Sequence, residues 1–365
     1  MARSLPLVGS ANAARHRVAD REDRRVLIGV DVGGTTTSGG LVTPEGEIVS
    51  AIQVPTHHAG PGTGVEALFE VVGDLLAEAR SRGCSVEGIG VGIPGPVDCE
   101  KGMMLPFRNN HVPEFSDVPI AARLGALAGV LAFVDNDVNA LALAEWAFGL
   151  GRGAASLVVL AIGSGAGGGI ILDGRLVRGR GYAGELGHVS VKFDGPRCRC
   201  GAPGCLAAYL SGGGLAERAR DRVASQPGAA LLALAGGDPE RITAALVSQA
   251  AAAGDAVATA LIEEGCVALA ASLGGIVNAL NPEVIVVTGG VAAALLPRAE
   301  EVLRHVAQYA LAPALERTRI HFVPSDKRRT VLGGAALVLY ETRARGASPP
   351  PLGMEVRDAE VLRRA

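Results

Sequence analysis

The sequence predicts an α/β protein in which short apolar strands alternate with helices rich in alanine and leucine. Strand-like apolar runs, several of them followed by glycines or acidic residues, cover residues 26–32, 88–95, 130–137, 156–165 and 283–290. Helical spacing of apolar residues marks the stretches 64–81, 138–149, 255–280 and 291–309. Because the two patterns alternate, we expect buried central strands with helices packed on the faces of the sheet.

The length of 365 residues allows two domains with separate cores. Glycine-rich loops begin again after the strand at 130–137, so we place a domain boundary there. We therefore divide the chain into a mobile tail (1–24), an N-terminal α/β domain (25–137), a C-terminal α/β domain (138–333), a last helix (334–343) and a second tail (344–365).

Composition excludes several classes of protein. Charged residues are 19 % and hydrophobic residues 48 %, as in globular proteins, and the formal charge of −3 argues against binding nucleic acid. No apolar run approaches the ~20 residues of a membrane span, so we expect no membrane partner. Six cysteines, three of them clustered, and no recognisable signal peptide favour a reducing cytoplasm.

A compact group of one histidine and three cysteines predicts a metal site. His188, Cys198, Cys200 and Cys205 fit a tetrahedral, structural Zn²⁺ site with no open position, which we call the zinc knuckle (188–205). Glycines and a proline between the last two cysteines supply the tight turn. Three unrelated buried thiols are a less favoured interpretation, and a disulfide is weaker still because Cys198 and Cys200 are too close to pair comfortably.

Three glycine loops follow predicted strands and predict phosphate binding. They run from Asp31 to Thr35, from Gly163 to Gly169 and from Thr288 to Val291. Glycine allows backbone amides to approach an anion closely, although a single such loop often only connects a strand to a helix. The loops match neither the Walker A motif nor the dinucleotide fingerprint. Asp31, at the end of a strand, is the expected anchor for Mg²⁺, and capping the turn is its alternative role.

Two polar clusters are candidates for binding and catalysis. Asp137 is placed to accept a proton from an alcohol that attacks a phosphate, with Asn136 orienting the same substrate. The alternative is that Asp135 or Asp137 only caps the following helix. Glu185 and His188 are expected to face one polyol, but a surface ion pair for Glu185 and zinc binding alone for His188 are the alternatives.

The order of these motifs resembles the ROK family, which joins bacterial glucokinases and other sugar kinases to sugar-sensing repressors. The likeness spans roughly residues 26–340 and rests on DVGGT, VDNDVNA, GSGAGGG, GELGH, CRCGAPGC and NPEVIVVTGG. It implies the actin-like ATPase fold of hexokinases, with two α/β domains closing over ATP and sugar. It also implies one role for each matched residue: Asp137 as catalytic base, Asn136, Glu185 and His188 as sugar contacts, Asp31 as the carboxylate on the Mg²⁺ side, Gly33, Gly34, Thr35, Gly163, Ser164 and Gly165 around phosphates, and Gly289 and Gly290 near adenosine.

The sequence departs from the family pattern around the sugar. The family continues GC-x-Glu after the last zinc cysteine, with the Glu reaching hydroxyls near the anomeric carbon, whereas this chain has Ala207. The loop from Asn109 to Phe115 is one residue longer than usual, Ser164 replaces a threonine, and Thr36 replaces a lysine or asparagine. The elements for phosphoryl transfer are retained, while the wall that recognises C1 and C2 is changed.

The resemblance therefore implies a cytoplasmic, homodimeric, ATP-dependent kinase that phosphorylates the primary hydroxyl of a glucose-like ring. Because of Ala207 we expect a ring altered at C1–C3, such as a C7-cyclitol of the valiolone type or an amino-hexose, with glucose as the alternative. A repressor of this family carries a DNA-binding domain before the first glycine loop, and only 30 residues precede Asp31 here. A non-catalytic sugar sensor, the remaining alternative, is expected to lose Asp137, which this chain keeps.

Overall fold

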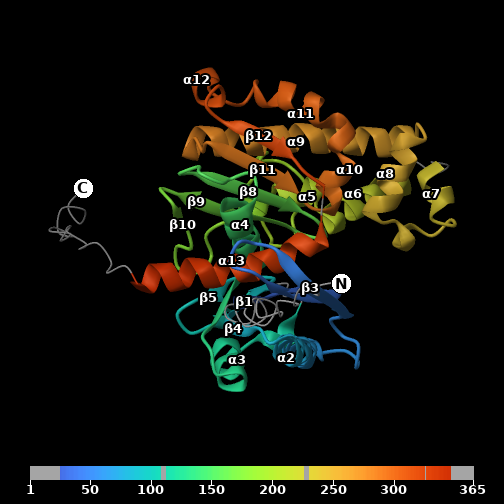
Figure 1. The fold of residues 1–365 in the computed structure, drawn as a ribbon. Helices are drawn as coiled ribbons and strands as arrows, with labels where there is room; N and C mark the ends of the chain where they lie inside the picture. Colours follow the sequence, from blue (N-terminus) through green and yellow to red (C-terminus); the bar gives the residue numbers. More distant parts are fainter. Residues whose placement is uncertain (1–24, 108–111, 226–229, 325, 347–365) are drawn as a thin grey trace, which may run out of the picture.

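The structure is a computed structural model that describes residues 25–107, 112–225, 230–324 and 326–346. These residues form two mixed five-stranded sheets, one in each half of the molecule, with helices around and between them (Figure 1). The predicted α/β class is therefore correct. The tail at 1–24, and the part of the second tail from 347 onward, lie outside the described residues.

The first sheet has the strand order β3-β2-β1-β4-β7. Its strands are β1 (Arg25–Val32), β2 (Thr36–Val42), β3 (Ile48–Pro55), β4 (Ser85–Ile93) and β7 (Ala132–Asn136). Strands β1, β4 and β7 are parallel, so their carboxyl ends meet at one edge. Gly92 of β4 pairs with Asp31 on one side and with Asp135 on the other, which brings the two polar strand ends into the same row.

The second sheet repeats this arrangement, with the order β10-β9-β8-β11-β12. Its strands are β8 (Leu157–Ile162), β9 (Ala166–Leu172), β10 (Arg175–Leu176), β11 (Val284–Thr288) and β12 (Arg319–Phe322). The parallel pairing of β8 with β11 sets Ala161 opposite Thr288. The tight β8–β9 turn and the end of β11 therefore lie at one edge of this sheet.

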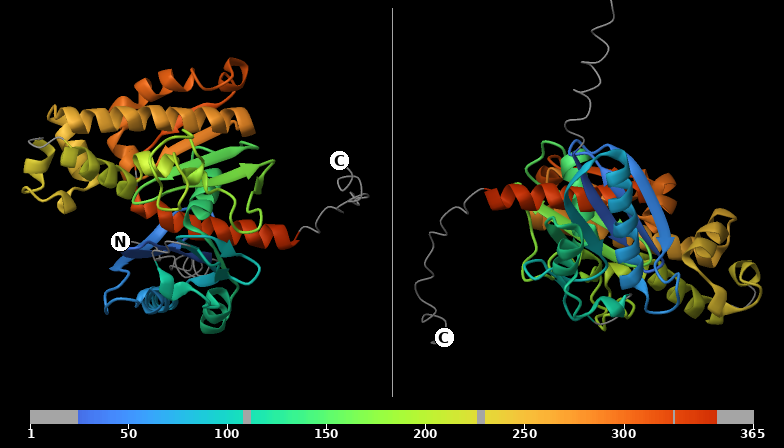
Figure 2. Two further views of the ribbon diagram at one scale, coloured as in Figure 1. Left: turned by 180° about the vertical axis from the view of Figure 1, so that it is seen from behind. Right: turned by 60° about the horizontal axis from the view of Figure 1, so that its bottom comes forward.

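The helices form layers on both sheets and one layer between them. Helices α2 (Gly64–Arg82) and α3 (Ile120–Ala128) lie on the outer side of the first sheet, while α4 (Asp137–Phe148) and α13 (Lys327–Gly346) lie between the two halves (Figures 1 and 2). The second half also contains α5 (Leu206–Leu210), α6 (Gly212–Ser225), α7 (Ala230–Leu234), α8 (Ala244–Ala252), α9 (Ala256–Leu280), α10 (Gly290–Ala294), α11 (Ala299–Val306) and α12 (Ala312–Leu315). The short elements are β5 (Val97–Asp98), β6 (Met103–Met104) and single 3₁₀ turns at Pro113–Phe115, Leu186–His188, Pro239–Arg241 and Leu296–Arg298.

Helix α13 is held against the first sheet by glycines. A Cβ on Gly29 of β1 would lie 1.9 Å from the carbonyl oxygen of Val331, and one on Gly90 of β4 would lie 1.9 Å from that of Gly334. Only glycine permits this approach of helix to strand. The helix expected at 334–343 is thus the later part of a longer helix, which begins at Lys327 and returns the chain to the first sheet.

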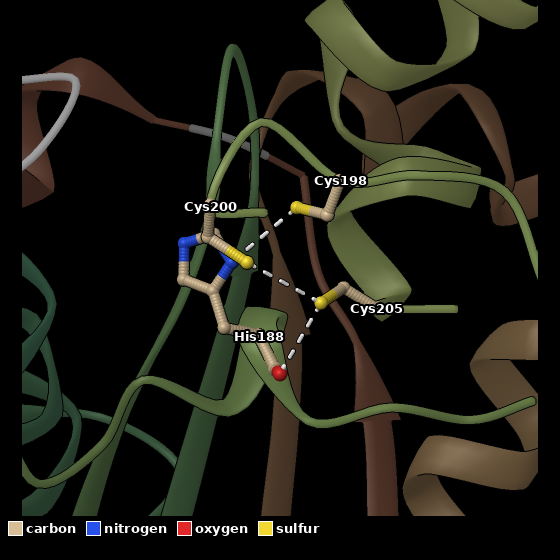
Figure 3. A group of neighbouring side chains, drawn as sticks. All are labelled: His188, Cys198, Cys200 and Cys205. Atoms are coloured by element: carbon tan, nitrogen blue, oxygen red, sulfur yellow. Dashed lines mark hydrogen bonds between the residues drawn. The ribbon is translucent and has the colours of Figure 1, made fainter. Parts of the chain in front are cut away.

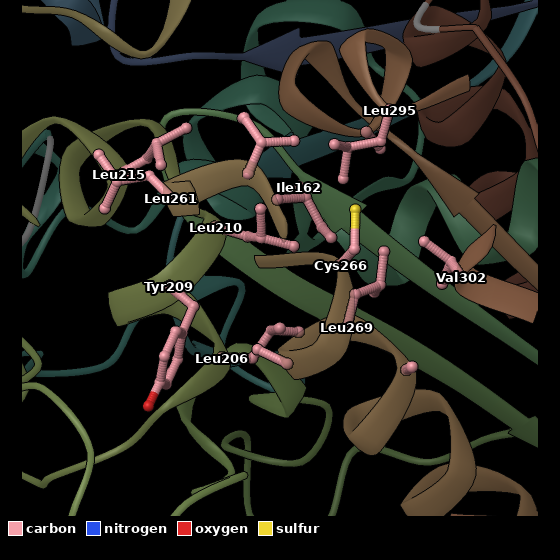
Figure 4. Close-up of a cluster of buried hydrophobic side chains, with 14 of the residues drawn as sticks. Ile162, Leu206, Tyr209, Leu210, Leu215, Leu261, Cys266, Leu269, Leu295 and Val302 are labelled. Carbon is pink, nitrogen blue, oxygen red and sulfur yellow. The ribbon is translucent and has the colours of Figure 1, made fainter. Parts of the chain in front are cut away.

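A large apolar core holds the helices of the second half against its sheet (Figure 4). Leu206 and Leu210 of α5 are fully buried there, in a cluster that also contains Leu261 and Leu269 of α9. The cluster fixes α5, which carries the position where the family pattern has a glutamate. Helix α9 is long and apolar enough to cross a membrane by composition alone, contrary to our expectation that no such run exists. However, 67 % of its most apolar window is buried in the protein, as in a core helix.

The five predicted strands are present, and so are three of the four predicted helices. The stretch 291–309 divides into α10, a 3₁₀ turn and α11, because Pro297 has no amide hydrogen for a continuous helix. Strands β2, β3, β9, β10 and β12 of the two sheets were not predicted. In β2 and β9 glycines replace apolar side chains, which weakens the alternation by which a strand is identified from sequence.

Candidate functional site

A cleft of about 1490 Å³ lies between the two sheets, and the predicted polar clusters and glycine loops open into it. All of the predicted non-cysteine site residues line it: Asp31, Gly33, Gly34, Thr35, Asn136, Asp137, Gly163, Ser164, Gly165, Glu185, His188, Gly289 and Gly290. Segments that are far apart in the sequence therefore meet in one site, as ligand sites do at the carboxyl ends of α/β sheets.

The turn between β7 and α4 is held by Asn136, which is the N-cap of the helix. Its Oδ1 accepts hydrogen bonds from the amides of Val138 (2.9 Å) and Asn139 (3.1 Å), and its Nδ2 donates to the carbonyl oxygen of Gly95 (3.1 Å). The cap is therefore neither Asp135 nor Asp137. Among the described residues only one hydrogen of the Asn136 amide has a partner, and the other is available because a side-chain amide carries two.

Asp137 follows the cap and opens into the cleft. Its Oδ1 accepts one hydrogen bond, from the amide of Val138 at 2.9 Å. Burial of the carboxyl, reinforced by the nearby carboxylate of Asp31, raises the pKa of Asp137 to about 7. Glu185 adds to this rise. A carboxyl group with a pKa near neutrality can accept a proton at physiological pH and release it again.

Glu185 and His188 come from the loop that crosses the cleft after β10. Burial raises the pKa of Glu185 above its usual range, and the nearby His188 opposes that rise. Among the described residues Glu185 forms no salt bridge within 4.0 Å, so the alternative of a surface ion pair is not what the structure has. Both side chains line the cleft, and Glu185 is near enough to Asp137 to raise its pKa.

Two glycine turns expose backbone to the cleft, one from each sheet. In the first, the amide of Gly33 donates to the carbonyl oxygen of Thr36 at 2.9 Å, which closes the turn between β1 and β2. In the second, the amide of Gly163 donates to the carbonyl oxygen of Gly165 at 2.8 Å. A Cβ on Gly163 or on Gly165 would meet nothing within 4 Å, so both positions face open space.

The third turn joins β11 to α10 and depends on glycine. Gly289 has a φ of +103°, and a Cβ there would lie 2.4 Å from the carbonyl oxygen of Ile162. Gly290 has open space around it instead. The later glycines of the GSGAGGG run, from Gly167 to Gly169, belong to strand β9 and do not form a loop. They allow α4 to approach, since a Cβ on Gly169 would lie 2.6 Å from the carbonyl oxygen of Val138.

The four predicted zinc ligands lie together beside the cleft (Figure 3). Their ligand atoms are all within 4.8 Å of one another, with Cys198 Sγ 3.5 Å from His188 Nδ1 and Cys200 Sγ 3.6 Å from Cys205 Sγ. A tetrahedral zinc site with Zn–S bonds of about 2.3 Å has ligand separations of about 3.6–3.8 Å, so the group fits Zn²⁺. Burial raises the pKa of Cys205 to about 12, and a bound cation would favour its thiolate.

The metal centre adjoins the wall where this chain departs from the family pattern. Cys198, Cys200, Ala207 and Ala208 line the cleft, whereas Cys205 is buried behind them. Ala207 is 6 % exposed and belongs to a small apolar cluster with the zinc cysteines. The wall therefore presents methyl groups and sulfur atoms beside Glu185 and His188, and no carboxylate at Ala207.

Sequence reasoning missed two sets of charged residues. Arg199, between two zinc cysteines, forms an ion pair with Glu217 of α6 at 2.6 Å, and both line the cleft. Arg178 forms ion pairs with Asp135 and Glu341 behind the turn that carries Asp137. An aspartate at the end of a buried strand needs a partner, and this was the available signal for Asp135.

Comparisons with known proteins agree with this arrangement. A glucokinase from Thermotoga maritima is 33 % identical over 318 residues, 86 % of this chain and 96 % of that protein. An N-acetyl-D-glucosamine kinase from Salmonella paratyphi A is 33 % identical over 305 residues, 80 % of this chain and 93 % of that protein. A ROK glucokinase from Streptomyces griseus, solved with glucose and AMPPNP, has a TM-score of 0.69 at 30 % identity and covers 87 % of this chain and 99 % of its own.

A ROK hexokinase from Thermus thermophilus has a TM-score of 0.72 at 30 % identity, over 88 % of this chain and 100 % of its own. The model of the ROK family itself matches residues 27–341. These matches confirm the actin-like ATPase fold. They extend over the first sheet, the cleft and the zinc knuckle, so the chain belongs to the ROK family and is an ATP-dependent sugar kinase.

Proposed function

We propose that this kinase transfers the γ-phosphoryl group of ATP to the primary hydroxyl of a glucose-like ring that is altered at C1–C3, such as a C7-cyclitol or an amino-hexose. This proposal rests on Ala207, because the ROK family pattern has a glutamate at this position that contacts the hydroxyls near C1 of the sugar. Between the two candidate classes, an amino-hexose has support from the similarity to N-acetyl-D-glucosamine kinases. A C7-cyclitol rests on the changed wall alone, and phosphorylation of glucose is the alternative favoured by the similarity to glucokinases.

Asp137 is the proposed general base. The acceptor hydroxyl must lose its proton as it attacks the γ-phosphorus, and a carboxylate within reach takes that proton. A pKa of about 7 suits this task, since the group is largely ionised at slightly alkaline pH yet basic enough to hold a proton. Asn136 holds the turn, and its second amide hydrogen is free to orient the acceptor.

The glycine turns are the proposed phosphate site. Backbone amides around Gly34, Thr35 and Ser164 lie in two turns that open into the same cleft, one from each sheet. Such turns bind anions through oriented N–H groups. Asp31 is the residue placed to hold Mg²⁺, directly or through water, and the ion when bound with ATP offsets the negative charge of the phosphates. Gly289 and Gly290 are proposed to lie against the nucleoside.

Glu185 and His188 are the proposed contacts to the ring hydroxyls. Carboxylate and imidazole groups form strong hydrogen bonds with hydroxyls in a site that excludes water. A glutamate at position 207 would add a charge-assisted hydrogen bond to the ring, worth about 1.5–3 kcal/mol, which Ala207 cannot form. A hydroxyl at C1 or C2 therefore meets methyl and sulfur atoms here, and a larger or less polar substituent gains room.

The test is a comparison of acceptors by coupled ADP release. Glucose, N-acetyl-D-glucosamine, 3-amino and 2-amino hexoses and a C7-cyclitol are compared by kcat/KM at saturating ATP. Polyphosphate is tested as a second donor by direct detection of the phosphorylated acceptor, because it releases no ADP. We expect a ring altered at C1–C3 to exceed glucose by at least about tenfold, a difference of about 1.4 kcal/mol in transition-state binding. A clear preference for glucose would overturn the altered-ring proposal and leave a glucokinase.

The proposal also covers where the kinase acts and how it assembles. ATP as donor and three thiolates around zinc are compatible with a reducing cytoplasm, which we propose as the site of action. A homodimer stays a prediction, and sedimentation equilibrium of the purified chain tests it.

A further inference from the structure

A buried ion-pair network lies behind the turn that carries Asp137. Arg178 Nε donates to Asp135 Oδ2 at 2.7 Å, and Arg178 Nη2 donates to Glu341 Oε1 at 2.6 Å. The side chain of Asp135 is only 2 % exposed. The guanidinium also lies over the ring of Tyr340, with its carbon 5.5 Å from the ring centre. One arginine therefore bridges two carboxylates and rests on an aromatic face.

The three charged residues come from three different parts of the fold. Asp135 lies in β7 of the first sheet, one residue before its end, and Arg178 follows β10 of the second sheet. Glu341 belongs to α13, which lies between the two sheets (Figure 1). Strand β10 is itself attached to α13, because the amide of Leu176 donates to the hydroxyl oxygen of Tyr340 at 3.0 Å. The guanidinium therefore joins the two halves of the molecule at the helix between them.

The second oxygen of Asp135 holds the catalytic turn. Its Oδ1 accepts hydrogen bonds from the backbone amide of Asn136 at 2.7 Å and from Nδ2 of Asn139 at 2.9 Å. Asn136 directly precedes Asp137, and Asn139 lies in the first turn of α4. With one oxygen on Arg178 and the other on this turn, the carboxylate fixes where β7 ends and α4 begins.

Arg178 also begins the loop that leads to Glu185 and His188, the proposed contacts to the sugar. Its carbonyl oxygen accepts from the amides of Gly181 (2.8 Å) and Ala183 (3.2 Å), which folds the loop back on Arg178. The hydroxyl of Tyr182 donates to the carbonyl oxygen of Pro106 at 2.8 Å, on the side of the first sheet. Two residues after Ala183, the same loop carries Glu185 into the cleft.

A buried acceptor without a partner lies where the network approaches that loop. Among the described residues, Asn139 Oδ1 is buried and has no hydrogen bond. A Cβ on Gly184 would lie 3.7 Å from Asn139 Oδ1. The free oxygen therefore faces the backbone of Gly184, the residue before Glu185. The hydrogen-bonded network therefore runs from Arg178 through Asp135 to Asn139, and the free oxygen of Asn139 lies near the backbone that precedes Glu185.

We propose that Arg178 is a positioning residue for phosphoryl transfer, which sets the turn of Asp137 relative to the loop of Glu185 by holding Asp135 and Glu341 at once. The inference rests on the proposed function, in which Asp137 is the base and Glu185 binds the ring. Transfer requires the acceptor oxygen, the base and the phosphorus to be aligned, and a misplacement of about 1 Å costs about 10²-fold in rate. Among the described residues Arg178 does not line the cleft, so its effect passes through Asp135.

The test compares Arg178→Met and Arg178→Lys with Arg175→Met as the matched control. Arg175 is an exposed arginine on β10, three residues earlier, and its loss removes the same charge. We expect Arg178→Met to lower kcat by about 10–100-fold while KM for ATP changes less than about twofold, because the glycine turns are untouched. Arg178→Lys should recover part of kcat, since a lysine reaches one carboxylate but cannot bridge two as a guanidinium does.

A double variant separates positioning from stability. Arg178→Met leaves the Asp135 carboxylate buried and unpaired, so its Tm should fall, and adding Asp135→Asn removes that charge. The amide oxygen of the substituted side chain still accepts from the turn, so Tm should recover in the double variant while kcat stays low. Recovery of kcat together with Tm, or a kcat of Arg178→Met within about twofold of the wild type, overturns the inference. Every variant is assayed at least about 15 °C below its own Tm, on the acceptor that the wild type prefers.

The proposed function fails by a different result. Normal turnover of Asp137→Asn contradicts the assignment of the base, whereas normal turnover of Arg178→Met contradicts this inference. Arg175→Met should keep kcat and both KM values, and a loss there equal to that of Arg178→Met would show a general effect of charge and would also overturn the inference.

Discussion

Asp31 and Asp137 both lie next to Gly92, and the carboxylate of Asp31 raises the pKa of Asp137. Asp31 pairs with Gly92 in the sheet, and a Cβ on Gly92 would lie 3.1 Å from the Cα of Asp137. The fold thus brings together two carboxyl groups with different proposed roles: Asp31 holds Mg²⁺, and Asp137 accepts the proton of the acceptor hydroxyl. A raised pKa suits the residue that accepts the proton, and neighbouring carboxyl groups in active sites divide their functions through such shifts.

Asp137→Asn tests the base directly. The amide keeps the size of the side chain and loses the ability to accept the hydroxyl proton, so kcat should fall by about 10²–10⁴-fold. ATP binding should be nearly unchanged, because the glycine turns do not involve Asp137. Steady-state kinetics and ATP titration by calorimetry check the two parts. A variant with near-normal turnover would show that Asp137 only supports the first turn of α4.

The raised pKa of Asp137 predicts the pH dependence of activity. The base must be ionised to act, so kcat/KM for the acceptor should fall on the acid side with an apparent pKa of about 7. The profile is measured from pH 5.5 to 9 with Mg²⁺ and ATP well below saturation, so that it reports the free enzyme, in which no Mg²⁺ offsets the charge of Asp31. A flat profile down to pH 5.5 would contradict a base with this pKa.

The same shift predicts how Asp137 affects stability. The folded-state pKa lies above the usual aspartate value of 3.8, so the native protein holds the proton more tightly than the unfolded chain. Stability from this group is therefore present at low pH and is lost as pH rises from about 4 to about 7. Asp137→Asn removes the loss, so its Tm relative to the wild type should rise between pH 5 and pH 8. Calorimetric scans of both proteins across that range measure the difference.

The sequence predicted which residues line the cleft better than it predicted which residues hold them in place. The ends of β1, β7, β8 and β11 were readable because apolar runs stop at glycines or acids, and such ends meet at sheet edges. Arg178 carried no such signal, because a single arginine in a polar loop looks like a surface residue. Its two partners are 43 and 163 residues away in the chain, and only the tertiary fold brings them together.

The metal centre is expected to hold about one Zn²⁺ per chain, measured by elemental analysis of the purified protein. Cys200→Ser should lose the metal and raise KM for the acceptor, because His188 belongs to both the zinc knuckle and the cleft. Cys84→Ser is the matched control, since Cys84 is a free thiol that does not line the cleft. Active wild-type protein without zinc, or equal metal content in both variants, would refute the site.

Two adjacent glycines allow a matched test of the third turn. Gly289→Ala places a methyl group 2.4 Å from the carbonyl oxygen of Ile162 and forces a side chain to a φ of +103°, so it should lower Tm by several degrees. Gly290→Ala meets open space and should keep Tm. Both should raise KM for ATP if the nucleoside lies against this turn. Equal Tm values for the two variants would contradict the packing, and unchanged KM for ATP in both would contradict the nucleotide assignment.

Ala207→Glu tests the wall that sets the acceptor. Leu206 and Leu210 anchor α5 in the core, and Ala207 between them lines the cleft. We therefore expect a longer side chain at position 207 to remain at the cleft wall. A carboxylate there restores a partner for hydroxyls at C1 and C2, and a site that hydrogen-bonds a hydroxyl discriminates far more strongly than an apolar one. We expect kcat/KM for glucose to rise by about tenfold or more relative to the altered ring, through KM in particular.

Ala245→Glu is the control for that substitution, because it adds the same charge at an exposed position of α8 that lines another part of the cleft. It should leave the ratio between acceptors unchanged. A carboxylate at 207 also lies beside the zinc cysteines, so zinc content is measured in both variants, and an intact metal centre shows that any shift comes from the acceptor wall. If Ala207→Glu keeps zinc and leaves the ratio of kcat/KM values unchanged, position 207 does not set the acceptor, and the argument for an altered ring fails with it.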